Sequence, residues 1–178
     1  MKKVVVIVGP SGCGKTAIVK NICQKYFGYF EKVVTDTSRT PRGGEKDGID
    51  YNFVDVSRFS NGEYLESACY AGNWYGTRKA SVDNIIAKGK IPVLIMDIQG
   101  ADSIRKVYGN DAVVIFIDRS LEESADAVDS RKCSPEEKEK RKAQLQSDYE
   151  VKTRCDRTIK NNGTLDDAAT KVVVCAFS

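Results

Sequence analysis

The chain has 178 residues, of which 41% are hydrophobic and 30% charged, and its formal net charge is +3. This length predicts one domain with a sizeable core, while the small net charge argues against broad binding to nucleic acid or to membrane surfaces. The chain has no histidine and six scattered cysteines without a C-x-x-C pair, which excludes imidazole chemistry and the common zinc and thioredoxin-like motifs.

The first predicted element is a β-strand over residues 4–8, a continuous β-branched run that is typical of a buried parallel strand. Gly9 and Pro10 end this run, so it is too short for a signal peptide, and no apolar stretch of the sequence reaches the length of a membrane span. We therefore expect a cytoplasmic protein with reduced thiols and no membrane partner.

The segment Gly9–Thr16 follows this strand and fits the phosphate-binding loop (P-loop) pattern G-x-x-x-x-G-K-[ST]. Apolar residues at helical spacing come next, so the pattern has its required place between a strand and a helix. Glycines let backbone N–H groups converge on phosphate oxygens, Lys15 supplies positive charge for the outer phosphates, and the Thr16 hydroxyl is a Mg²⁺ ligand. This context disfavours the alternative of a glycine-rich turn that binds nothing. The expected ATP contacts in the loop are Gly9, Ser11, Gly12, Cys13, Gly14, Lys15 and Thr16, with Thr16 as the metal ligand.

A second strand is expected to begin at Val33–Val34 and to end near Thr37. From residue 38 to residue 76 the chain is rich in Gly, Asp, Arg and Tyr, with short strand-like pieces and no long helical pattern. This composition predicts a small, mostly β insertion on an α/β core.

Strands and helices alternate over the rest of the chain, which predicts an α/β fold. Asp97 ends one of these strands, at the edge where open α/β sheets bind ligands. The charge pairs Glu136–Lys140 and Glu137–Arg141 are expected on a solvated helix face. The expected elements are a helix over residues 81–88 closed by Gly89, a strand over residues 91–97, a helix ending at Tyr108, a strand over residues 112–117, a helix opened by Ser134, Pro135 and a capping-box glutamate, and a helix from Thr164 to near Cys175.

Two arginines, Arg39 and Arg42, flank a proline-fixed turn in the predicted insertion. Guanidinium groups match phosphate oxygens bidentately, so the pair suits a second phosphate site that faces the P-loop. On composition alone, a solvated basic turn is an equally good interpretation. Glu66, Tyr51 and Tyr75, each taken singly, are ordinary strand or surface residues.

Taken together, these segments resemble the guanylate kinase family over nearly the whole chain. The resemblance rests on the P-loop, on residues 40–54, on residues 72–76, on the Asp-Ile-Gln-Gly run at residues 97–100 and on Asn161, and residues 40–54 are its most specific part. It implies a P-loop NTPase fold with a three-layer α/β/α core around a central parallel sheet, a small mostly β insertion for a nucleoside monophosphate, and a helical lid. The implied division is a core of residues 1–34, 78–125 and 155–178, an insertion of residues 35–77 and a lid of residues 126–154.

The resemblance also implies roles for individual residues. Glu66 and Thr77 would contact the guanine edge, and a carboxylate suits this base because guanine offers N1–H and a 2-amino group, a donor pair that adenine lacks. Asp97 would approach the base or a metal-bound water. Arg131 and Arg141 match the lid arginines that would clamp the transferring phosphoryl group, and Asn161 matches a position near the adenine of ATP. Thr35, Arg39, Arg42, Tyr51 and Tyr75 would hold the GMP phosphate.

Two positions depart from the family pattern. Ile95 stands where the family has the first of two aspartates, so that Mg²⁺ would depend more on Thr16 and the phosphates. Residues 125–128, Ala-Asp-Ala-Val, lack a basic residue that the family commonly has before the lid. One positive charge fewer near the transferring group lowers the expected rate.

The predicted function is Mg²⁺-dependent phosphoryl transfer from ATP to GMP or dGMP, with Lys15, Arg42, Arg131 and Arg141 as the catalytic residues. The expected partners are small nucleotides, without nucleic acid or membrane, in a monomer or homodimer. Two alternatives remain open: a guanylate-kinase-like interaction module that has lost catalysis, and a related kinase that acts on a phosphorylated sugar. An intact P-loop disfavours the first alternative, and an acceptor for the guanine edge disfavours the second.

Overall fold

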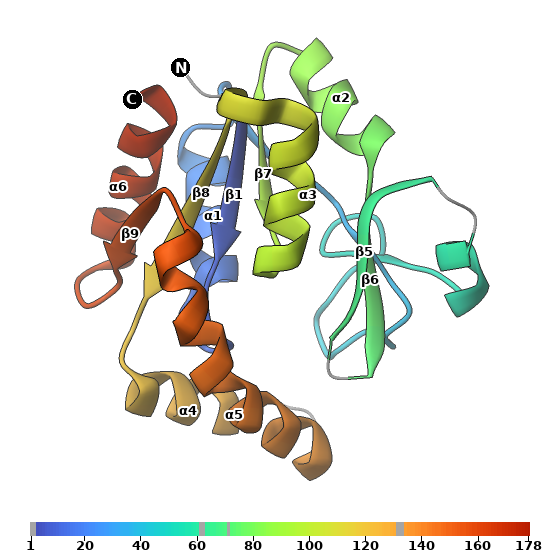
Figure 1. Ribbon diagram of the computed structural model, residues 1–178, viewed down its shortest axis with the longest axis vertical. Coiled ribbons are helices and arrows are strands. Elements are labelled where there is room, and N and C mark those ends of the chain that lie inside the picture. The colour runs from blue at the N-terminus through green and yellow to red at the C-terminus, as the bar shows by residue number, and fades with distance from the viewer. Residues whose placement is uncertain (1–2, 61–62, 71, 131–133) are drawn as a thin grey trace.

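The computed structural model describes residues 3–60, 63–70, 72–130 and 134–178. At its centre is a five-stranded parallel sheet with the strand order β2-β7-β1-β8-β9, and helices cover both of its faces (Figure 1). This arrangement confirms the predicted three-layer α/β/α core. The strands of this sheet are β1 (Val4–Val8), β2 (Phe30–Lys32), β7 (Ile91–Ile95), β8 (Ala112–Asp118) and β9 (Arg157–Lys160).

The helices of the described chain fall into groups. Helices α1 and α6 pack on one face of the parallel sheet, and α2 and α3 pack on the other. Helices α4 and α5 lie beyond the carboxyl ends of the strands (Figure 1). These helices are α1 (Lys15–Lys25), α2 (Lys79–Ala87), α3 (Ile98–Tyr108), α4 (Leu121–Asp129), α5 (Pro135–Glu150) and α6 (Leu165–Phe177).

The central strand β1 shows why the core forms. Consecutive side chains of a strand point to opposite faces, so Val5 and Ile7 pack with α1 and α6 while Val4 and Val6 pack with α2 and α3. A strand that is buried on both faces must be apolar throughout, and this is the pattern of the run. Each such side chain contributes about 1.5–3 kcal/mol by leaving water.

A second, four-stranded sheet with the order β4-β3-β6-β5 lies beside the parallel sheet (Figure 1). It confirms the predicted small β insertion, and in the described chain between Val34 and Arg78 its buried side chains are polar rather than hydrophobic. Short 3-10 turns occur at Val56–Ser60, Gly109–Asp111 and Val151–Arg154. The strands of the second sheet are β3 (Asp36–Thr37), β4 (Asn52–Phe53), β5 (Tyr64–Tyr70) and β6 (Asn73–Arg78).

One buried carboxylate, that of Asp36, joins all four strands of this sheet. It accepts hydrogen bonds from Asn52 Nδ2 at 2.7 Å, from the Tyr64 hydroxyl at 2.7 Å and from Arg78 Nε at 2.8 Å. These donors come from β4, β5 and β6. The Asp36 side chain is 1% exposed. Hydrogen bonds to this buried carboxylate therefore hold the second sheet together, whereas apolar packing holds the parallel sheet.

The structure corrects three expectations. The strand predicted from Val33–Val34 to Thr37 is a strand only at Asp36–Thr37, because residues 33–35 cross from the parallel sheet to the second sheet, and the preceding strand β2, which was not expected, ends at Lys32. Strand β9 was not expected, since Arg157 and Lys160 give it a polar pattern; it lies at the sheet edge, where one flank is open to water. The helix predicted over residues 81–88 already begins at Lys79.

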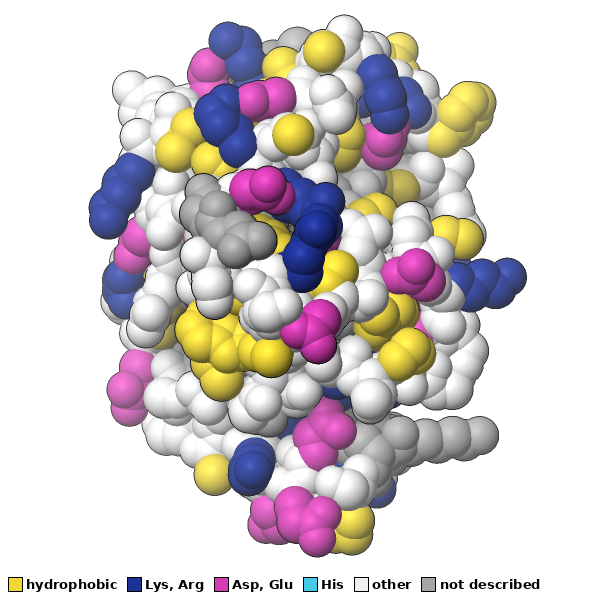
Figure 2. Space-filling model, turned by 90° about the vertical axis from the view of Figure 1, so that its right-hand side faces the viewer, with side chains coloured by type: hydrophobic (Ala, Val, Ile, Leu, Met, Phe, Trp, Pro, Cys, Tyr) yellow, Lys and Arg dark blue, Asp and Glu magenta, His cyan; other side chains and the backbone are white. Residues whose placement is uncertain are grey.

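Charge is mixed over the face that carries α2 and the second sheet (Figure 2). Lysine and arginine side chains alternate there with aspartate and glutamate, and no single sign dominates. Five of the six cysteines lie in the described chain and are free thiols, while Cys133 lies outside it. Within the described residues, no helix is long and apolar enough to cross a membrane.

Candidate active site

A cavity of about 870 Å³ lies between the P-loop, the second sheet and helix α5. Of the residues predicted for the site, those that line it are Gly9, Ser11, Gly12, Gly14, Lys15, Thr16, Thr35, Arg42, Tyr51, Glu66, Tyr75, Asp97 and Arg141. Cys13, Arg39, Thr77 and Asn161 do not line it, and Arg131 lies outside the described residues.

The P-loop has a backbone that only glycine adopts easily. Gly12 has a φ of 89°, and a Cβ there would lie 2.3 Å from the carbonyl oxygen of Ser124. Lys15 folds back over the loop, where its Nζ donates to the carbonyl oxygens of Gly9 at 2.6 Å and Pro10 at 2.8 Å. Its ammonium group is thereby held at the mouth of the loop, at the start of α1, where a phosphate would replace these carbonyls as its partner.

Asn161 holds the P-loop from behind. Its Nδ2 donates to the carbonyl oxygen of Cys13 at 2.8 Å, and a Cβ on Gly14 would lie 2.6 Å from the same atom. The Cys13 side chain is fully buried in the core, so this residue can offer a ligand only its backbone. In this structure Asn161 supports the loop, and its predicted place near adenine stays a prediction.

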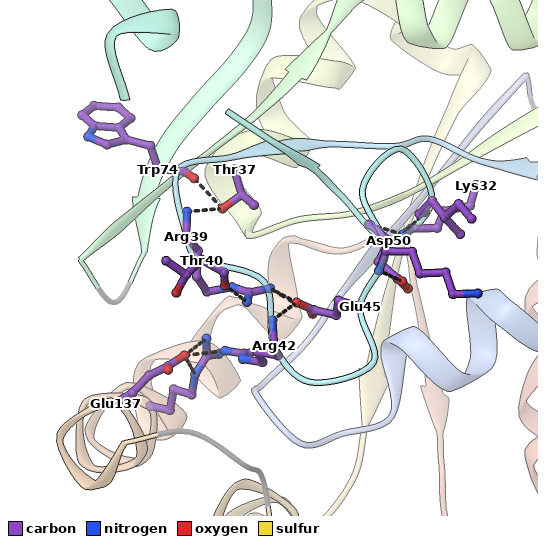
Figure 3. Close-up of polar contacts among 12 residues, drawn as sticks. Lys32, Thr37, Arg39, Thr40, Arg42, Glu45, Asp50, Trp74 and Glu137 are labelled. Carbon is purple, nitrogen blue, oxygen red and sulfur yellow. Dashed lines mark hydrogen bonds and ion pairs between the residues drawn. The ribbon is translucent and has the colours of Figure 1, made fainter. Parts of the chain in front are cut away.

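Glu45 organises the two arginines of the insertion (Figure 3). Its carboxylate accepts from Arg39 Nη2 at 2.9 and 3.0 Å and from the backbone N–H of Arg42 at 2.8 Å. Arg39 is 5% exposed and also lies 5.3 Å from the ring centroid of Tyr51. The Nε groups of Arg39 and Arg42 are buried and have no hydrogen-bond partner among the described residues.

Sequence reasoning assigned no role to Glu45, although a carboxylate three residues after Arg42, and separated from Arg39 by the proline turn, was a usable signal. It also missed Lys32, whose Nζ donates to the carbonyl oxygens of Ile49 at 3.2 Å and Asp50 at 2.5 Å. Lys32 thereby ties β2 to the loop before Tyr51 (Figure 3). Burial lowers the pKa of this lysine. No sequence signal pointed to Lys32, because β2 itself was not expected.

Two phenols close one wall of the cavity. The ring centroids of Tyr51 and Tyr75 lie 6.0 Å apart. Burial raises the pKa of Tyr51, so its hydroxyl stays protonated and able to donate at neutral pH. With Arg42 beside them, the tyrosines make this wall a set of hydrogen-bond donors.

Glu66 and Asp97 both line the cavity, and Thr77 lies beside Glu66 but outside the lining. Glu66 and Thr77 are opposite residues of the β5–β6 pair. Burial raises the pKa of Glu66 to about 7, and the neighbouring charge of Asp97 adds to the rise. The nearby Thr77 hydroxyl partly opposes this rise in the pKa of Glu66. Its oxygen is buried and makes no hydrogen bond of standard geometry within the described residues. Asp97 caps α3 by accepting from the backbone N–H of Gly100 at 2.8 Å.

Helix α5 brings Arg141 to the P-loop. Arg141 is 5% exposed, and its Nη1 donates to Ser11 Oγ at 3.2 Å. Glu137, one turn earlier, accepts from Arg141 Nε at 3.1 Å and Nη2 at 2.8 Å and also from Arg42 Nη2 (Figure 3).

This contact corrects two sequence expectations about Glu137. Its pair with Arg141 is buried rather than solvated, since Arg141 fills the space above the P-loop. Its side chain points to the arginines instead of completing a capping box with Ser134. Ser134 does cap the helix as predicted, by accepting from the backbone N–H of Glu137 at 3.2 Å.

Ile95 places a hydrocarbon side chain on the cavity wall. Within the described residues, no group of three or more histidine, cysteine, aspartate or glutamate side chains is arranged to hold a metal ion. Any metal in this cavity would therefore need most of its ligands from a bound molecule and from water. Mg²⁺ bound to phosphates accepts such an arrangement, because it keeps several waters and needs few protein ligands.

Known proteins are similar to this chain over most of its length. The family profile described as guanylate kinase matches residues 1–175. A guanylate kinase of Gloeobacter violaceus is 34% identical over 167 residues, 91% of this chain and 81% of that protein. One of Methylobacillus flagellatus is 38% identical over 130 residues, 71% of this chain and 62% of that protein. The crystal structure of guanylate kinase from Anaplasma phagocytophilum has a TM-score of 0.74 at 27% identity, and the match covers 98% of this chain and 84% of that one.

Proposed function

Since the chain belongs to the guanylate kinase family, we propose that it transfers a phosphoryl group from ATP to GMP or dGMP, giving ADP and GDP or dGDP. The observation that carries this proposal is the single cavity that Lys15 and Thr16 line on one side and Arg42 and Glu66 on the other. ATP as the phosphoryl donor and GMP as the acceptor would therefore lie in one continuous space. Direct transfer requires this arrangement.

The chemistry asks the protein for positioning and charge rather than for a base. The acceptor oxygen of GMP is already ionised, and the transition state spreads negative charge over the transferring group. Lys15, Arg42 and Arg141 would surround that charge, joined by Arg131 on the grounds of the family resemblance alone. Thr16 would hold Mg²⁺ together with the phosphates, and the ion would neutralise charge on them.

The proposed acceptor site divides into a phosphate half and a base half. Arg42, Tyr51 and Tyr75 line the cavity and suit the phosphate, and Arg39 lies beside Tyr51, where its guanidinium would join them. Glu66 suits the base, because ionised it accepts from both N1–H and the 2-amino group of guanine. Adenine would leave a buried carboxylate unpaired, so discrimination between the two bases should be large. Thr35 lines the same space, and Thr77 lies beside Glu66 with a buried hydroxyl that has no hydrogen-bond partner among the described residues.

We further propose the division into a core of residues 1–34, 78–125 and 155–178, an acceptor insertion of residues 35–77 and a lid of residues 126–154. The separate second sheet and the position of α5 over the P-loop support this division. Closure of the insertion and the lid on their ligands would exclude water and keep hydrolysis of ATP slow.

A coupled assay of ADP release tests the proposal, with ATP and Mg²⁺ and with GMP, dGMP, AMP, UMP and CMP in turn. We expect turnover with the two guanine nucleotides only. Turnover with none of them, while GMP still binds, would contradict the proposed catalysis and favour an interaction module. Equal turnover with AMP would contradict the proposed role of Glu66.

A further inference from the structure

Glu137 joins three parts of the molecule that are far apart in the sequence. Its Oε1 accepts from Arg42 of the insertion, ninety-five positions away, and from Arg141 of α5, which itself donates to Ser11 of the P-loop. Glu45 continues the chain of contacts to Arg39. An uninterrupted polar path thus connects the P-loop, α5 and the insertion, and Figure 3 shows the part of it that runs from Glu137 through Arg42 and Glu45 to Arg39.

An ordinary helix pair does not explain this arrangement. An i,i+4 glutamate–arginine pair stabilises a helix by only a few tenths of a kcal/mol and needs no third partner. Here the third partner is Arg42, whose guanidinium would otherwise be repelled by that of Arg141. Burial alone would raise the pKa of Glu137, but hydrogen bonds from Arg141 and Arg42 outweigh it and hold the pKa below its ordinary value. The carboxylate is therefore ionised at neutral pH and neutralises part of the charge of the pair.

We infer that Glu137 is a positioning residue that couples occupation of the acceptor site to the placement of Arg141 over the P-loop. This inference rests on the proposed function, in which Arg42 belongs to the acceptor site and Arg141 to the transferring group. In the described part of the chain, Glu137 takes up one terminal nitrogen of the Arg42 guanidinium, and Arg42 lines the cavity, so its remaining N–H groups can bind an acceptor phosphate without releasing Glu137. Movement of Arg42 toward that phosphate is then transmitted to Arg141 through one shared oxygen atom.

The test is the thermodynamic coupling between the two nucleotides, measured by calorimetry. GMP is titrated into the protein alone and into the protein saturated with a non-hydrolysable ATP analogue and Mg²⁺. We expect the wild type to bind GMP more tightly in the second case, by a coupling factor on the order of 5–150. The substitution Glu137→Gln keeps the shape and removes the charge, and it should bring that factor close to one.

Glu136→Gln is the matched control, because Glu136 lies in the same helical turn, is exposed and does not contact the two arginines. It should leave the coupling factor unchanged, whereas Glu137→Asp should restore part of it. In turnover at saturating GMP, Glu137→Gln should lower kcat/KM for ATP, because the coupling between two ligands is reciprocal and its loss also weakens the binding of ATP to the GMP complex. An unchanged coupling factor in Glu137→Gln, or an equal loss in Glu136→Gln, would overturn the inference. Absence of turnover in the wild type would instead count against the proposed function, since the coupling is measured without turnover.

Discussion

The two sheets of this molecule are stabilised by different forces. In the parallel sheet, the side chains of β1 are at most 2% exposed and entirely apolar. In the described part of residues 35–77, the buried side chains are Asp36, Thr37, Arg39 and Thr77, and a carboxylate with three donors joins the strands of the second sheet. Apolar burial is non-directional and tolerates small changes of position, whereas a buried polar group is stable only while each partner stays in place.

This difference fits the division of work in the proposed function. The parallel sheet fixes the P-loop through the carboxyl end of β1 and needs little movement of its own. The second sheet carries Glu66 and lies next to the arginines of the acceptor site, where polar groups have to meet a polar ligand. A region with few buried apolar contacts also opens at low free-energy cost, as a segment that closes on a substrate must.

The largest effect should come from Asp36→Asn, which removes the charge at the centre of the second sheet. The amide keeps one acceptor oxygen and turns the other into a donor, so Arg78 would lose its charged partner and at least one of the donors would meet an N–H; breaking a buried ion pair from one side costs about 3–5 kcal/mol. Hydrogen exchange followed by mass spectrometry should show faster exchange in residues 36–78 and nearly unchanged exchange in the parallel sheet. The matched control is Asp55→Asn, because Asp55 is exposed and bonds only to Ser57 within its own turn. Faster exchange throughout the molecule would contradict the separate stabilisation of the two sheets.

Glu66→Gln should come next, with kcat/KM for GMP about 10–100-fold lower and KM for ATP unchanged. Hydrogen bonds to a charged group contribute about 1.5–3 kcal/mol, and the amide replaces one acceptor by a donor. Initial rates at varied GMP measure this effect, with Glu63→Gln as the exposed control on the same insertion. A Glu66→Gln enzyme with normal kcat/KM for GMP would show that the base is read elsewhere.

The pH dependence of GMP affinity should follow from the pKa of about 7 for Glu66. Binding to guanine favours the ionised carboxylate of Glu66. The affinity for GMP should therefore reach its highest value well above pH 7 and fall by up to tenfold per pH unit below it. Calorimetry between pH 5.5 and pH 8.5 measures this fall. The phosphate of GMP titrates in the same range, so the relevant quantity is the difference between wild type and Glu66→Gln. Parallel curves for the two proteins would mean that Glu66 keeps its charge throughout.

The smallest effect should be that of Ile7→Val, which removes one methylene from the fully buried centre of β1. Such a change typically costs about 0.5–1.5 kcal/mol because it leaves a small cavity. Chemical denaturation should show this loss for the whole molecule, with KM for GMP unchanged. A selective loss of GMP affinity would mean that the core and the insertion are not energetically separate.

Much of the core could be predicted because short local patterns in the sequence, such as a run of β-branched residues, specify one kind of element. The continuous β-branched run of β1 and the capping box of Thr164 and Asp167 are local patterns that needed no tertiary information. The P-loop was predictable for the same reason. The proposed acceptor residues were assigned only through the family resemblance, since Glu66 or Tyr51 alone resembles any strand residue.

What the sequence could not give are contacts between distant segments. Glu137 formed a plausible pair with Arg141, but nothing in the sequence placed Arg42 beside both. Lys32 lies on a strand that its own residues barely indicate, and the loop it contacts is seventeen positions away. The role of Asp36 could not be predicted either, because its three donors come from three other strands that are distant in the sequence. Such polar contacts depend on the finished fold.

The most direct test of the account is calorimetric binding of GMP, IMP and AMP to the wild type, since the account places recognition of the base at Glu66. GMP offers the carboxylate two donors, IMP lacks the 2-amino group, and AMP lacks both donors. We expect the tightest binding for GMP, binding about 10–100-fold weaker for IMP, and the weakest binding for AMP. Equal affinity for the three nucleotides would contradict the account, because the polar insertion would then hold a phosphate without reading the base.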